Sequence, residues 1–524
     1  MRTSRMRTAA AASLAAAGLV AATLAATTTS AGATGSSTIR VPLRVCKTAT
    51  AGHRACDALR MVTKKVTPAN AKKLESQGLA KATGAPRVGT GPEGGFSPAG
   101  LAKAYGINEN AKTKKTVAIV DAFDDPSVRS DLNAFDKHYG FHKETTKSFK
   151  VIGQDGGAPP ATSDEGWAGE ITLDVQSVRA ICRHCKILLV EANDNNDNNL
   201  ANAVKEAIKK GATIVSNSYG GPESPADPKW IQKAYSHKHT AILASSGDDG
   251  WYDWDNVNSL VASSGMSQSP ASYPHVVGVG GTTLYTSQAG KRTSEQAWNR
   301  NGPADFLGSA SEYTYGYEPG AAGSGCSAKY NAPKWQKSVK GYKSLGCGSK
   351  RSEVDIAALA DPFTGFDIYE TFDWCTNPDT SVCPYTSADD GWSTYGGTSL
   401  ASPVTAAMWG LAGGPSKHVA YPAQTLYANY KKHKSDTYDV TVGGTGGCFD
   451  QSPKACGTFL QDIVYGPPTT HYAENPNTGP GGLLDCAWGK TGNKPKTNRG
   501  QCYAQPGYDG VSGVGSPKGL KVFK

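Results

Sequence analysis

The amino-acid sequence predicts an α/β domain built on a parallel sheet with helices on both faces. First, runs of aliphatic and β-branched residues alternate with helix-like segments between residues 116 and 279. Second, the run Thr116–Asp121 is largely apolar without alternation, as in strands buried on both faces. Third, 61 glycines and 30 prolines in 524 residues indicate many turns and long surface loops. Because strands and helices alternate, the sheet is expected to be parallel.

The expected elements follow one another in a regular order. Ser97 and Pro98 fit the N-cap and the first position of an opening helix. We expect strands at residues 116–121, 186–192, 213–217, 240–245 and 275–279, and helices at residues 126–139, 170–180, 200–210, 228–237 and 396–411. Ligands of parallel sheets bind at the carboxyl ends of strands, which here carry Asp121, residues 216–221 and residues 245–250.

The N-terminal residues predict a secretory signal. Three arginines precede an alanine-rich apolar stretch from residue 9 to about residue 26, and Ala31-Gly32-Ala33 offers small residues to a signal peptidase. A retained membrane anchor is the weaker interpretation, because the stretch is short and broken by threonines. We therefore expect a secreted protein with a signal peptide at 1–33, a short pro-segment and linker at 34–95, and one large domain at 96–524.

Twelve cysteines in a chain with such a signal indicate disulfides. The sequence does not determine which cysteines pair. We expect cysteines that are neighbours in the sequence to pair and to close small loops. The expected pairs are Cys46–Cys56, Cys182–Cys185, Cys326–Cys347, Cys375–Cys383, Cys448–Cys456 and Cys486–Cys502. A redox or metal role is the alternative for the second pair, which the lack of a second CxxC disfavours.

Charge and hydropathy exclude two kinds of partner. The net charge of +9 is spread along the chain, whereas a nucleic-acid-binding protein needs a concentrated basic face. No second apolar run is long enough to span a bilayer, so no membrane partner is expected after removal of the signal.

The stretch from Gly396 to Pro403 is the strongest candidate for chemistry. Two glycines allow a sharp turn, and the helix-like run that follows would take Pro403 in its first turn. Ser399 is then expected at a helix N-terminus, beside free N–H groups and the positive end of the dipole. That position suits a nucleophile whose substrate becomes an oxyanion. A Gly-Thr-Ser helix cap is the alternative interpretation.

A nucleophilic serine needs a base, and carboxylates are the candidates. None of the ten histidines stands in a His-Gly-Thr-His context, and no Gly-x-Ser-x-Gly elbow surrounds Ser399, which argues against a lipase or esterase. Glu170 and Asp174 are four residues apart on one helix face, where like charges raise the pKa of one partner. A solvated helix surface is the common alternative for such a pair.

Asp248 follows the expected strand 240–245 in the sequence Ser246-Gly247-Asp248. A carboxyl group that stays protonated, through burial or at low pH, donates a hydrogen bond to an oxyanion. The alternative is an aspartate that forms an Asx-turn.

Five ordered motifs resemble the sedolisin family, the serine-carboxyl peptidases with a subtilisin-like fold. They are Glu170-x-x-x-Asp174, residues 217–223, Ser246-Gly247-Asp248, residues 270–282, and Gly397-Thr398-Ser399 with Pro403, which is similar to the family's Ser-Gly-Thr-Ser-x-x-x-Pro signature. The similarity runs from about Phe96 to the C-terminus. Three features depart from the family: Gly396 replaces the first Ser, the region before Phe96 is much shorter than the usual pro-domain, and Asp121 ends the first strand as in subtilisins, as a relic or as a helper of the carboxylates.

The resemblance implies a single catalytic domain with a subtilisin-like sheet and a loop-rich, disulfide-bonded C-terminal part. It implies a serine-type endopeptidase that hydrolyses peptide bonds through an acyl-enzyme and works best at acid pH. The expected roles are nucleophile for Ser399, base for Glu170, partner of the base for Asp174 and oxyanion donor for Asp248. Ser218, Tyr219 and Gly220 belong to the strand that would pair with the substrate.

The resemblance also implies a calcium site near the C-terminus. The residues that fit the family's ligand positions are Asp462, Ile463, Gln505, Gly507 and Asp509, with Gln505 in place of a glycine. A glycine-rich turn with a capping aspartate is the alternative. We expect a monomer whose partner is a protein or peptide substrate.

Two other interpretations stay open, with an esterase as a remote third. The first is a secreted pseudoprotease that is catalytically weak or inactive and acts by binding; the short pro-segment and Gly396 favour it. The second is a neutral subtilisin-type peptidase that uses Asp121 and a histidine.

Overall fold

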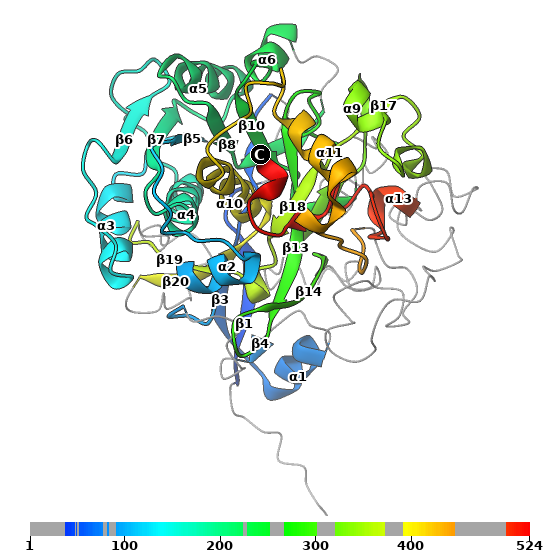
Figure 1. Cartoon of the computed structure of the whole chain (residues 1–524). Coiled ribbons are helices and arrows are strands. Elements are labelled where there is room, and N and C mark those ends of the chain that lie inside the picture. The colour runs from blue at the N-terminus through cyan, green and yellow to red at the C-terminus, as the bar shows by residue number, and fades with distance from the viewer. Residues whose placement is uncertain are drawn as a thin grey trace, which may run out of the picture.

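The computed structural model describes residues 37–47, 49, 52–76, 81–82, 91–223, 228–251, 267–300, 320–372, 391–445 and 499–524. Its centre is an eight-stranded sheet in the order β14-β13-β10-β8-β5-β7-β6, with β18 beside β13 (Figure 1). Seven of the strands are parallel, and β14 is antiparallel to β13. The strands are β5 (Thr116–Ala122), β6 (Phe149–Gly153), β7 (Lys186–Ala192), β8 (Ile214–Asn217), β10 (Ala241–Ser245), β13 (Val277–Thr286), β14 (Arg292–Ala297) and β18 (Ile356–Leu359).

Helices flank this sheet, as the sequence predicts. Helices α4 (Glu165–Ile181) and α10 (Thr398–Leu411) pack against each other and against β5 (Figure 1). Helix α5 (Asp197–Lys209) packs on β5, β7 and β8, with α6 (Lys229–Ala234) on its outer side. Helices α2 (Pro98–Tyr105) and α3 (Val128–His138) pack on α4, and α11 (Ala423–Lys432) packs on α9 (Lys334–Lys337) and on the C-terminal turn η6 (Lys521–Phe523).

The remaining elements are short and connect this core to its loops. They are α1 (Pro68–Ser76), α13 (Arg499–Cys502), β1 (Ser37–Arg44), β2 (Ala55–Cys56), β3 (Leu59–Val66), β4 (Lys81–Ala82), β9 (Tyr219–Pro222), β11 (Asp249–Trp251), β12 (Gln268–Ser269), β15 (Ala321–Ser324), β16 (Cys326–Asn331), β17 (Lys350–Ser352), β19 (Phe366–Tyr369), β20 (Trp392–Gly396), β21 (Thr437–Tyr438), β22 (Ser516–Pro517), η2 (Tyr342–Leu345), η3 (Pro362–Thr364) and η4 (Lys434–Asp436).

The two central helices are buried almost completely. Every residue of α4 from Gly166 to Ile181 and of α10 from Thr398 to Gly410 is buried. Helix α4 begins at Glu165, five residues before the expected start, because the Asp164 side chain caps it by accepting the Trp167 N–H at 3.1 Å. A helix that is buried on all sides holds its polar side chains in the protein interior. Burying such a side chain costs free energy unless it is hydrogen-bonded, so these side chains are candidates for function.

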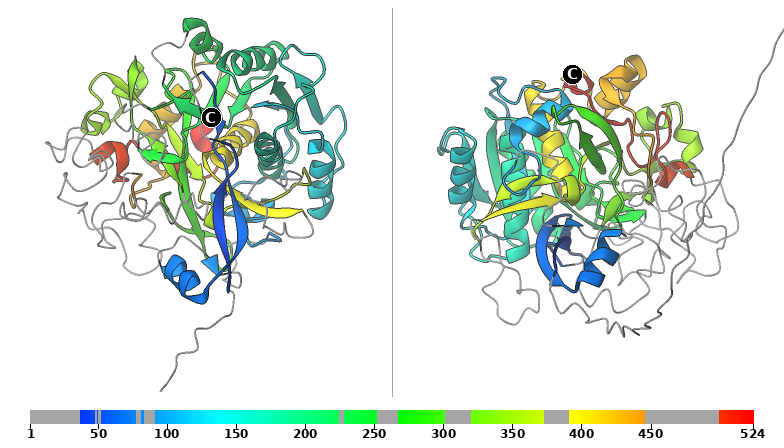
Figure 2. Two further views of the ribbon diagram at one scale, coloured as in Figure 1. Left: turned by 180° about the vertical axis from the view of Figure 1, so that it is seen from behind. Right: turned by 90° about the horizontal axis from the view of Figure 1, so that it is seen from below.

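The N-terminal region folds onto this core rather than forming a separate unit. Strands β1 and β3 pair antiparallel over eight residues, and β3 also pairs with β20, next to α10. Seen from behind, this hairpin runs beside β20 and α10, with α1 at its far end (Figure 2). Strand β2 pairs with β9. Part of the segment 34–95, which we expected to be a pro-segment and linker, therefore lies in two sheets beside the core.

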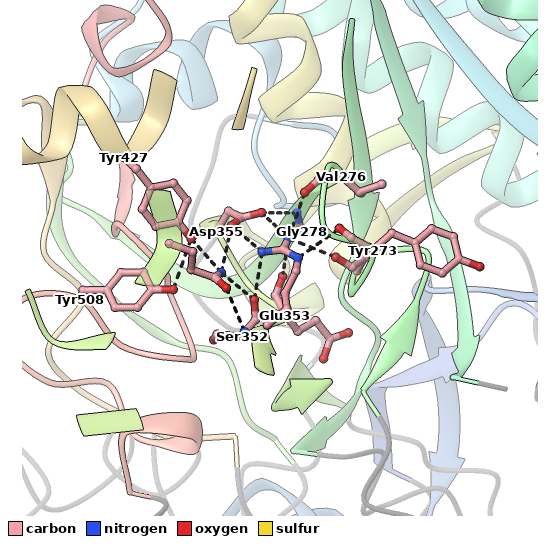
Figure 3. Close-up of polar contacts among 11 residues, drawn as sticks. Tyr273, Val276, Gly278, Ser352, Glu353, Asp355, Tyr427 and Tyr508 are labelled. Atoms are coloured by element: carbon pink, nitrogen blue, oxygen red, sulfur yellow. Dashed lines mark hydrogen bonds and ion pairs between the residues drawn. The ribbon is translucent and has the colours of Figure 1, made fainter. Parts of the chain in front are cut away.

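A buried ion pair joins the sheet to the C-terminal part of the chain. The Arg351 guanidinium donates to both carboxylate oxygens of Asp355, at 2.9 and 2.6 Å, and to the carbonyl oxygens of Tyr273 and Val276 at 3.1 and 2.9 Å. Asp355 also accepts the Tyr427 hydroxyl at 2.6 Å and the Gly278 N–H at 2.9 Å (Figure 3). This network ties β13 to α11 through compensated charges.

Three of the expected disulfides are confirmed: Cys46–Cys56, Cys182–Cys185 and Cys326–Cys347. The other three pairs each include at least one cysteine outside the described residues. Among the helices that the structure describes, none combines the length and the hydropathy needed to cross a membrane.

Candidate active site

Ser399 lies at the N-terminus of α10, directly after the turn that ends β20. Gly397 is the N-cap, with a positive φ of 95° that favours glycine. A Cβ atom on Gly397 would stand 2.1 Å from the Asp57 carbonyl oxygen and 2.6 Å from Asp248 Oδ2. The glycine therefore gives two other groups access to the backbone N–H groups at the start of the helix. The Ser399 N–H donates to the Asp57 carbonyl oxygen at 2.9 Å.

Pro403 lies in the second turn of α10, so its expected place in the first turn is wrong. A proline within a helix has no N–H for the carbonyl four residues earlier, which here is that of Ser399. The Ser218 hydroxyl oxygen lies 3.3 Å from the freed Ser399 carbonyl oxygen. The proline thus leaves room for the side chain of Ser218, the residue before β9, which contacts both Ser399 and Asp174.

Glu170 and Asp174 lie on α4 with no solvent exposure. Burial raises the pKa of each carboxyl well above its usual value, and the other carboxyl groups nearby raise them further. Both carboxylate oxygens of Asp174 accept the Ser218 hydroxyl at 2.8 Å. Ser399 is close enough to lower the pKa of Glu170, although neither Glu170 oxygen has a hydrogen-bond partner of good geometry among the described residues. The pair is therefore not a solvated helix surface.

Asp121, at the end of β5, completes a group of three buried carboxyls. It is fully buried, and neither oxygen has a hydrogen-bond partner in the described part of the chain. Burial raises its pKa to about 8. Its charge raises the pKa of both Glu170 and Asp174, so the three carboxyls interact electrostatically. The strand order reverses around β5, where parallel sheets hold their ligands.

Asp248 faces the same turn from the other side. Its Oδ1 accepts the N–H and the hydroxyl of Thr398 at 2.7 and 2.9 Å, while Oδ2 has no hydrogen-bond partner among the described residues. Burial, and then the nearby Asp57 carboxyl, raise the pKa of Asp248 well above its usual value. A protonated Asp248 would carry its proton on Oδ2, the oxygen that lies near the start of α10.

The strand expected to pair with substrate is β9 with the residue before it. Strand β9 pairs on one side with β12 and on the other with β2, in the register Ala55 with Gly220 and Cys56 with Tyr219. The Ser218 carbonyl oxygen accepts the Ser399 hydroxyl at 3.0 Å. Tyr219 is buried, with its hydroxyl donated to Asn217 at 2.9 Å. Ser218 therefore contacts Ser399 directly, and Tyr219 and Gly220 follow it at the start of β9.

Sequence reasoning missed Asp57, which also lies at this site, and placed Ser245 at a strand end without giving it a role. The Asp57 N–H lies 3.1 Å from Ser399 Oγ and 3.3 Å from the Ser218 carbonyl oxygen. The Ser245 hydroxyl donates to the Asp57 carboxylate. Burial raises the pKa of Asp57 to about 7. The only hint in the sequence that residues near Asp57 are structured was the spacing of Cys46 and Cys56, which predicts a disulfide. That spacing does not show where on the protein the disulfide-closed loop packs.

Gly396 departs from the nucleophile signature for a steric reason. A Cβ atom at this position would stand 2.4 Å from both the Ala360 carbonyl oxygen and the Pro362 nitrogen. Because these are backbone atoms next to β18, a side chain at 396 has no room in this structure.

The expected calcium ligands are brought together only in part. Asp462 and Ile463 lie outside the described residues. Asp509 Oδ1 accepts the N–H groups of Val511 and Ser512 and the Ser512 hydroxyl, and Oδ2 accepts the Gln505 N–H at 2.9 Å. The described residues contain no cluster of three metal-ligating side chains. Asp509 thus acts as a turn-forming carboxylate, with Oδ2 alone keeping a lone pair for a cation.

Comparisons with known proteins agree with this geometry. The chain is 26% identical over 344 residues to sedolisin of Pseudomonas sp. (strain 101), covering 63% of this chain and 52% of that protein. It is 28% identical over 349 residues to kumamolisin of Bacillus sp. (strain MN-32), covering 63% of this chain and 55% of that protein. The chain thus spans about half the length of these curated relatives.

A solved structure shows the same fold. It is Pseudomonas sedolisin, a serine-carboxyl proteinase complexed with two molecules of pseudo-iodotyrostatin, with a TM-score of 0.54, 25% identity, and coverage of 67% of this chain and 89% of that chain. The model of the subtilase family matches residues 165–431, which include both α4 and α10. The chain therefore belongs to the subtilase family, with a subtilisin-like fold.

Proposed function

We propose that this chain is a serine-carboxyl peptidase that hydrolyses peptide bonds through an acyl-enzyme. The observation that carries the proposal is the meeting of a serine at a helix N-terminus with buried carboxyls from two other elements. Glu170 lies near Ser399, Asp248 contacts the preceding residue Thr398, and Ser218 connects Ser399 to Asp174. The likeness to sedolisin and kumamolisin supports the same reaction class.

In the proposed first step, Ser399 Oγ attacks the substrate carbonyl carbon while Glu170 takes the hydroxyl proton. The tetrahedral oxyanion accepts hydrogen bonds from the Ser399 N–H and from protonated Asp248 Oδ2. Glu170 then gives the proton to the leaving amine as the peptide C–N bond breaks. Water attacks the acyl-enzyme with Glu170 again as the base, which releases the acid product and restores the serine.

Two protonation states set the proposed pH dependence. Glu170 and Asp174 titrate as a coupled pair, and the pair must have lost a proton before it can accept one from Ser399. Asp248 must keep its proton in order to donate to the oxyanion. Burial raises the pKa of Asp248, so its proton is kept at acid pH and lost as the pH rises. We therefore expect kcat/KM to be greatest in acid and to fall toward alkaline pH.

The test is hydrolysis of denatured casein at acid pH by the purified protein. Ser399→Ala should abolish turnover. The matched control is Glu165→Gln on the same helix, since Glu165 is partly exposed in the first turn and should keep full activity. A pH profile of kcat/KM that is flat or rises toward alkaline pH would contradict the assignment. A folded wild-type protein without any hydrolysis would favour the pseudoprotease interpretation.

Calcium belongs to the same proposal as a structural ion. The part of the site that is described fits one carboxylate oxygen, Asp509 Oδ2, and no step of the reaction passes through the ion. Such an ion would supply only cross-linking of the C-terminal loops. Terbium luminescence titrated with the wild type and with Asp509→Asn tests the site independently of activity. We expect binding by the wild type and its loss in the variant.

Secretion and maturation are also proposed. The leader at 1–33 and the three disulfides support export to an oxidising compartment. We propose that residues 34–95 remain the pro-segment, that the peptidase domain spans 96–524, and that the enzyme acts as a monomer on proteins or peptides. N-terminal sequencing of the protein from culture medium tests these boundaries.

A further inference from the structure

A segment of the chain itself lies across the candidate active site. We call Arg54–Arg60 the cleft segment. Before Asp57 it pairs antiparallel with β9, through Ala55 opposite Gly220 and Cys56 opposite Tyr219. After Ala58 it pairs antiparallel with β20, through Leu59 opposite Gly396 and Arg60 opposite Tyr395. The cleft segment is therefore an extended strand bound on both sides of Ser399, as a peptide substrate would be.

The register of this strand puts one peptide bond at the nucleophile. The Asp57 N–H points to the Ser218 carbonyl oxygen at 3.3 Å, and the Asp57 carbonyl oxygen accepts the Ser399 N–H at 2.9 Å. That N–H is the donor that the proposed mechanism assigns to the oxyanion. The Asp57 carbonyl oxygen also lies at the point where Asp248 Oδ2 faces the turn. The bond between Asp57 and Ala58 thus occupies the position of a bond under attack.

The Asp57 side chain is buried and in contact with residues of β9 and β10. The Ser245 hydroxyl, at the end of β10, donates to its carboxylate. A Cβ atom on Gly220 would be 3.4 Å from Asp57 Oδ2. Asp57 is 3% exposed, so the position that receives the residue before the attacked bond is filled.

Both halves of the cleft segment are held independently of the attacked bond. The Cys46–Cys56 disulfide ties the half before Asp57 to the end of β1, and Arg54 pairs with Asp197 on α5. The half after Ala58 continues into β3, which pairs with β1 from Arg44–Leu59 to Ser37–Val66. The Val45 N–H donates to the Ala58 carbonyl oxygen at 3.0 Å. Cutting one bond would leave both new ends in place.

From these contacts we infer that the cleft segment is a built-in inhibitor, closed by the Cys46–Cys56 disulfide, with a self-cleavage site between Asp57 and Ala58. The inference rests on the proposed function. In the cleavage step, Ser399 Oγ bonds to the Asp57 carbonyl carbon, the bond to the Ala58 nitrogen breaks, and the hydroxyl proton passes through Glu170 to that nitrogen. Water then releases Asp57 as a carboxylic acid. Because the Ala58 amine stays beside the acyl carbon, re-formation of the peptide bond competes with water.

The first experiment asks whether the segment lies in the cleft, with no need for activity. Hydrogen–deuterium exchange is measured on full-length Ser399→Ala protein, which cannot cut itself. We expect slow exchange in peptides that cover residues 55–60 and 219–221, and faster exchange in both when Cys46→Ser and Cys56→Ser are added. Fast exchange at 55–60 in the parent protein would overturn the inference, whatever the chemistry.

The second experiment asks whether the bond is cut. Wild type and Ser399→Ala are incubated at acid pH, denatured, and mapped by mass spectrometry. We expect a new C-terminus at Asp57 and a new N-terminus at Ala58 in the wild type only. Casein hydrolysis with an intact bond after long incubation would overturn the self-cleavage site. A slow-exchanging segment in a protein that cuts neither this bond nor casein would instead mean that the proposed function fails.

The third experiment measures inhibition. Initial rates of casein hydrolysis are compared for the wild type, the Cys46→Ser/Cys56→Ser variant, and the matched control Cys326→Ser/Cys347→Ser, which opens a disulfide outside the cleft segment. We expect the first variant to be about tenfold faster or more, which is the gain from about 1.4 kcal/mol of lost loop binding, and the control to be no faster. An equal rise in both variants, or none in the first while it stays folded, would overturn the inhibitory role.

Discussion

Two buried polar clusters in this molecule are built in opposite ways. Around Asp355, a positive and a negative charge compensate each other, since the Arg351 guanidinium donates to both carboxylate oxygens of Asp355, which also accepts a tyrosine hydroxyl and a backbone N–H (Figure 3). Around Ser399, the buried groups are carboxyls without a buried cation in direct contact in the described structure, and several of their oxygens have no hydrogen-bond partner there. Burial is equally complete in both places.

The difference separates a cluster whose paired charges stabilise the fold from one whose carboxyls suit the proposed chemistry. A compensated ion pair fixes geometry, and breaking it leaves an unpaired buried charge. Uncompensated carboxyls are costly to bury and stay protonated at higher pH than usual, which suits groups that must give and take protons. Variants at the first cluster should therefore change stability, and variants at the second should change activity.

The largest expected effect is on turnover. Glu170→Gln should lower kcat by about 10²- to 10⁴-fold, the range of general acid–base catalysis, because the amide cannot take the Ser399 proton. Its free energy of unfolding should not fall, since a neutral amide is easier to bury than an ionised carboxylate. Steady-state kinetics on casein peptides and urea unfolding check both parts. A Glu170→Gln variant with a clearly lower free energy of unfolding than the wild type would contradict the view that this cluster, unlike the Asp355 cluster, does not stabilise the fold.

Next comes the loss of the ion pair. Arg351→Met should lower the free energy of unfolding by about 3–5 kcal/mol, because Asp355 is then buried without its partner. The double variant Arg351→Met/Asp355→Leu should recover much of this loss, since no charge is left unpaired. Thermal unfolding monitored by circular dichroism measures the series. Equal stability of the single variant and the wild type would show that the pair does not hold the fold.

A smaller effect is expected on the pH dependence of stability. Burial raises the Asp121 pKa from 3.8 to about 8, so the folded state binds this proton more tightly than the unfolded state. Its contribution to the free energy of unfolding is therefore complete below about pH 4 and is lost as the pH rises from about 4 to 8. Asp121→Asn should flatten this decline in urea titrations at several pH values. The exposed Asp155→Asn is the control and should leave the slope unchanged.

The smallest effect should come from restoring the serine of the nucleophile signature. Gly396→Ser should cost about 1–3 kcal/mol of stability, because its Cβ meets backbone atoms of Ala360 and Pro362. Gly157→Ser is the control, since the nearest atoms to its Cβ belong to the exposed Asp155 side chain, which can move. Urea unfolding compares the two. A Gly396→Ser protein as stable as the wild type would mean that the turn next to β18 can relax.

The sequence predicts well what depends on local pattern. The strand β7 matches its expected range, and β5 differs by one residue, because the apolar run at the centre of each is typical of a strand buried on both faces. The pair Glu170 and Asp174 was predicted from its helical spacing. In the structure both are buried, with Glu170 near Ser399 and Asp174 in contact with Ser218. Their catalytic roles stay predictions.

What the sequence could not predict depends on pairings across long distances. Strand β3 pairs with β1 on one side and with β20 on the other, and β20 is about 330 residues further along the chain. No local sequence pattern encodes that choice of partner. Asp57 was missed for the same reason, since its chemistry comes from the strand it docks beside. The place of Pro403 was wrong by a turn because helix boundaries are fixed by capping geometry, here the positive φ of Gly397.

The pairing of β9 and β20 with the N-terminal region has a consequence for the proposed enzyme, if that region is removed. Each strand keeps one neighbour, β12 or β19, so removal of the N-terminal strands would bare one edge of each, on either side of the nucleophile. An exposed strand edge can form main-chain hydrogen bonds with any extended peptide, whatever the side chains of that peptide. Such a protein would bind polypeptides mainly through their extended backbone. Its own loops, if they became extended, would compete for the same strand edges.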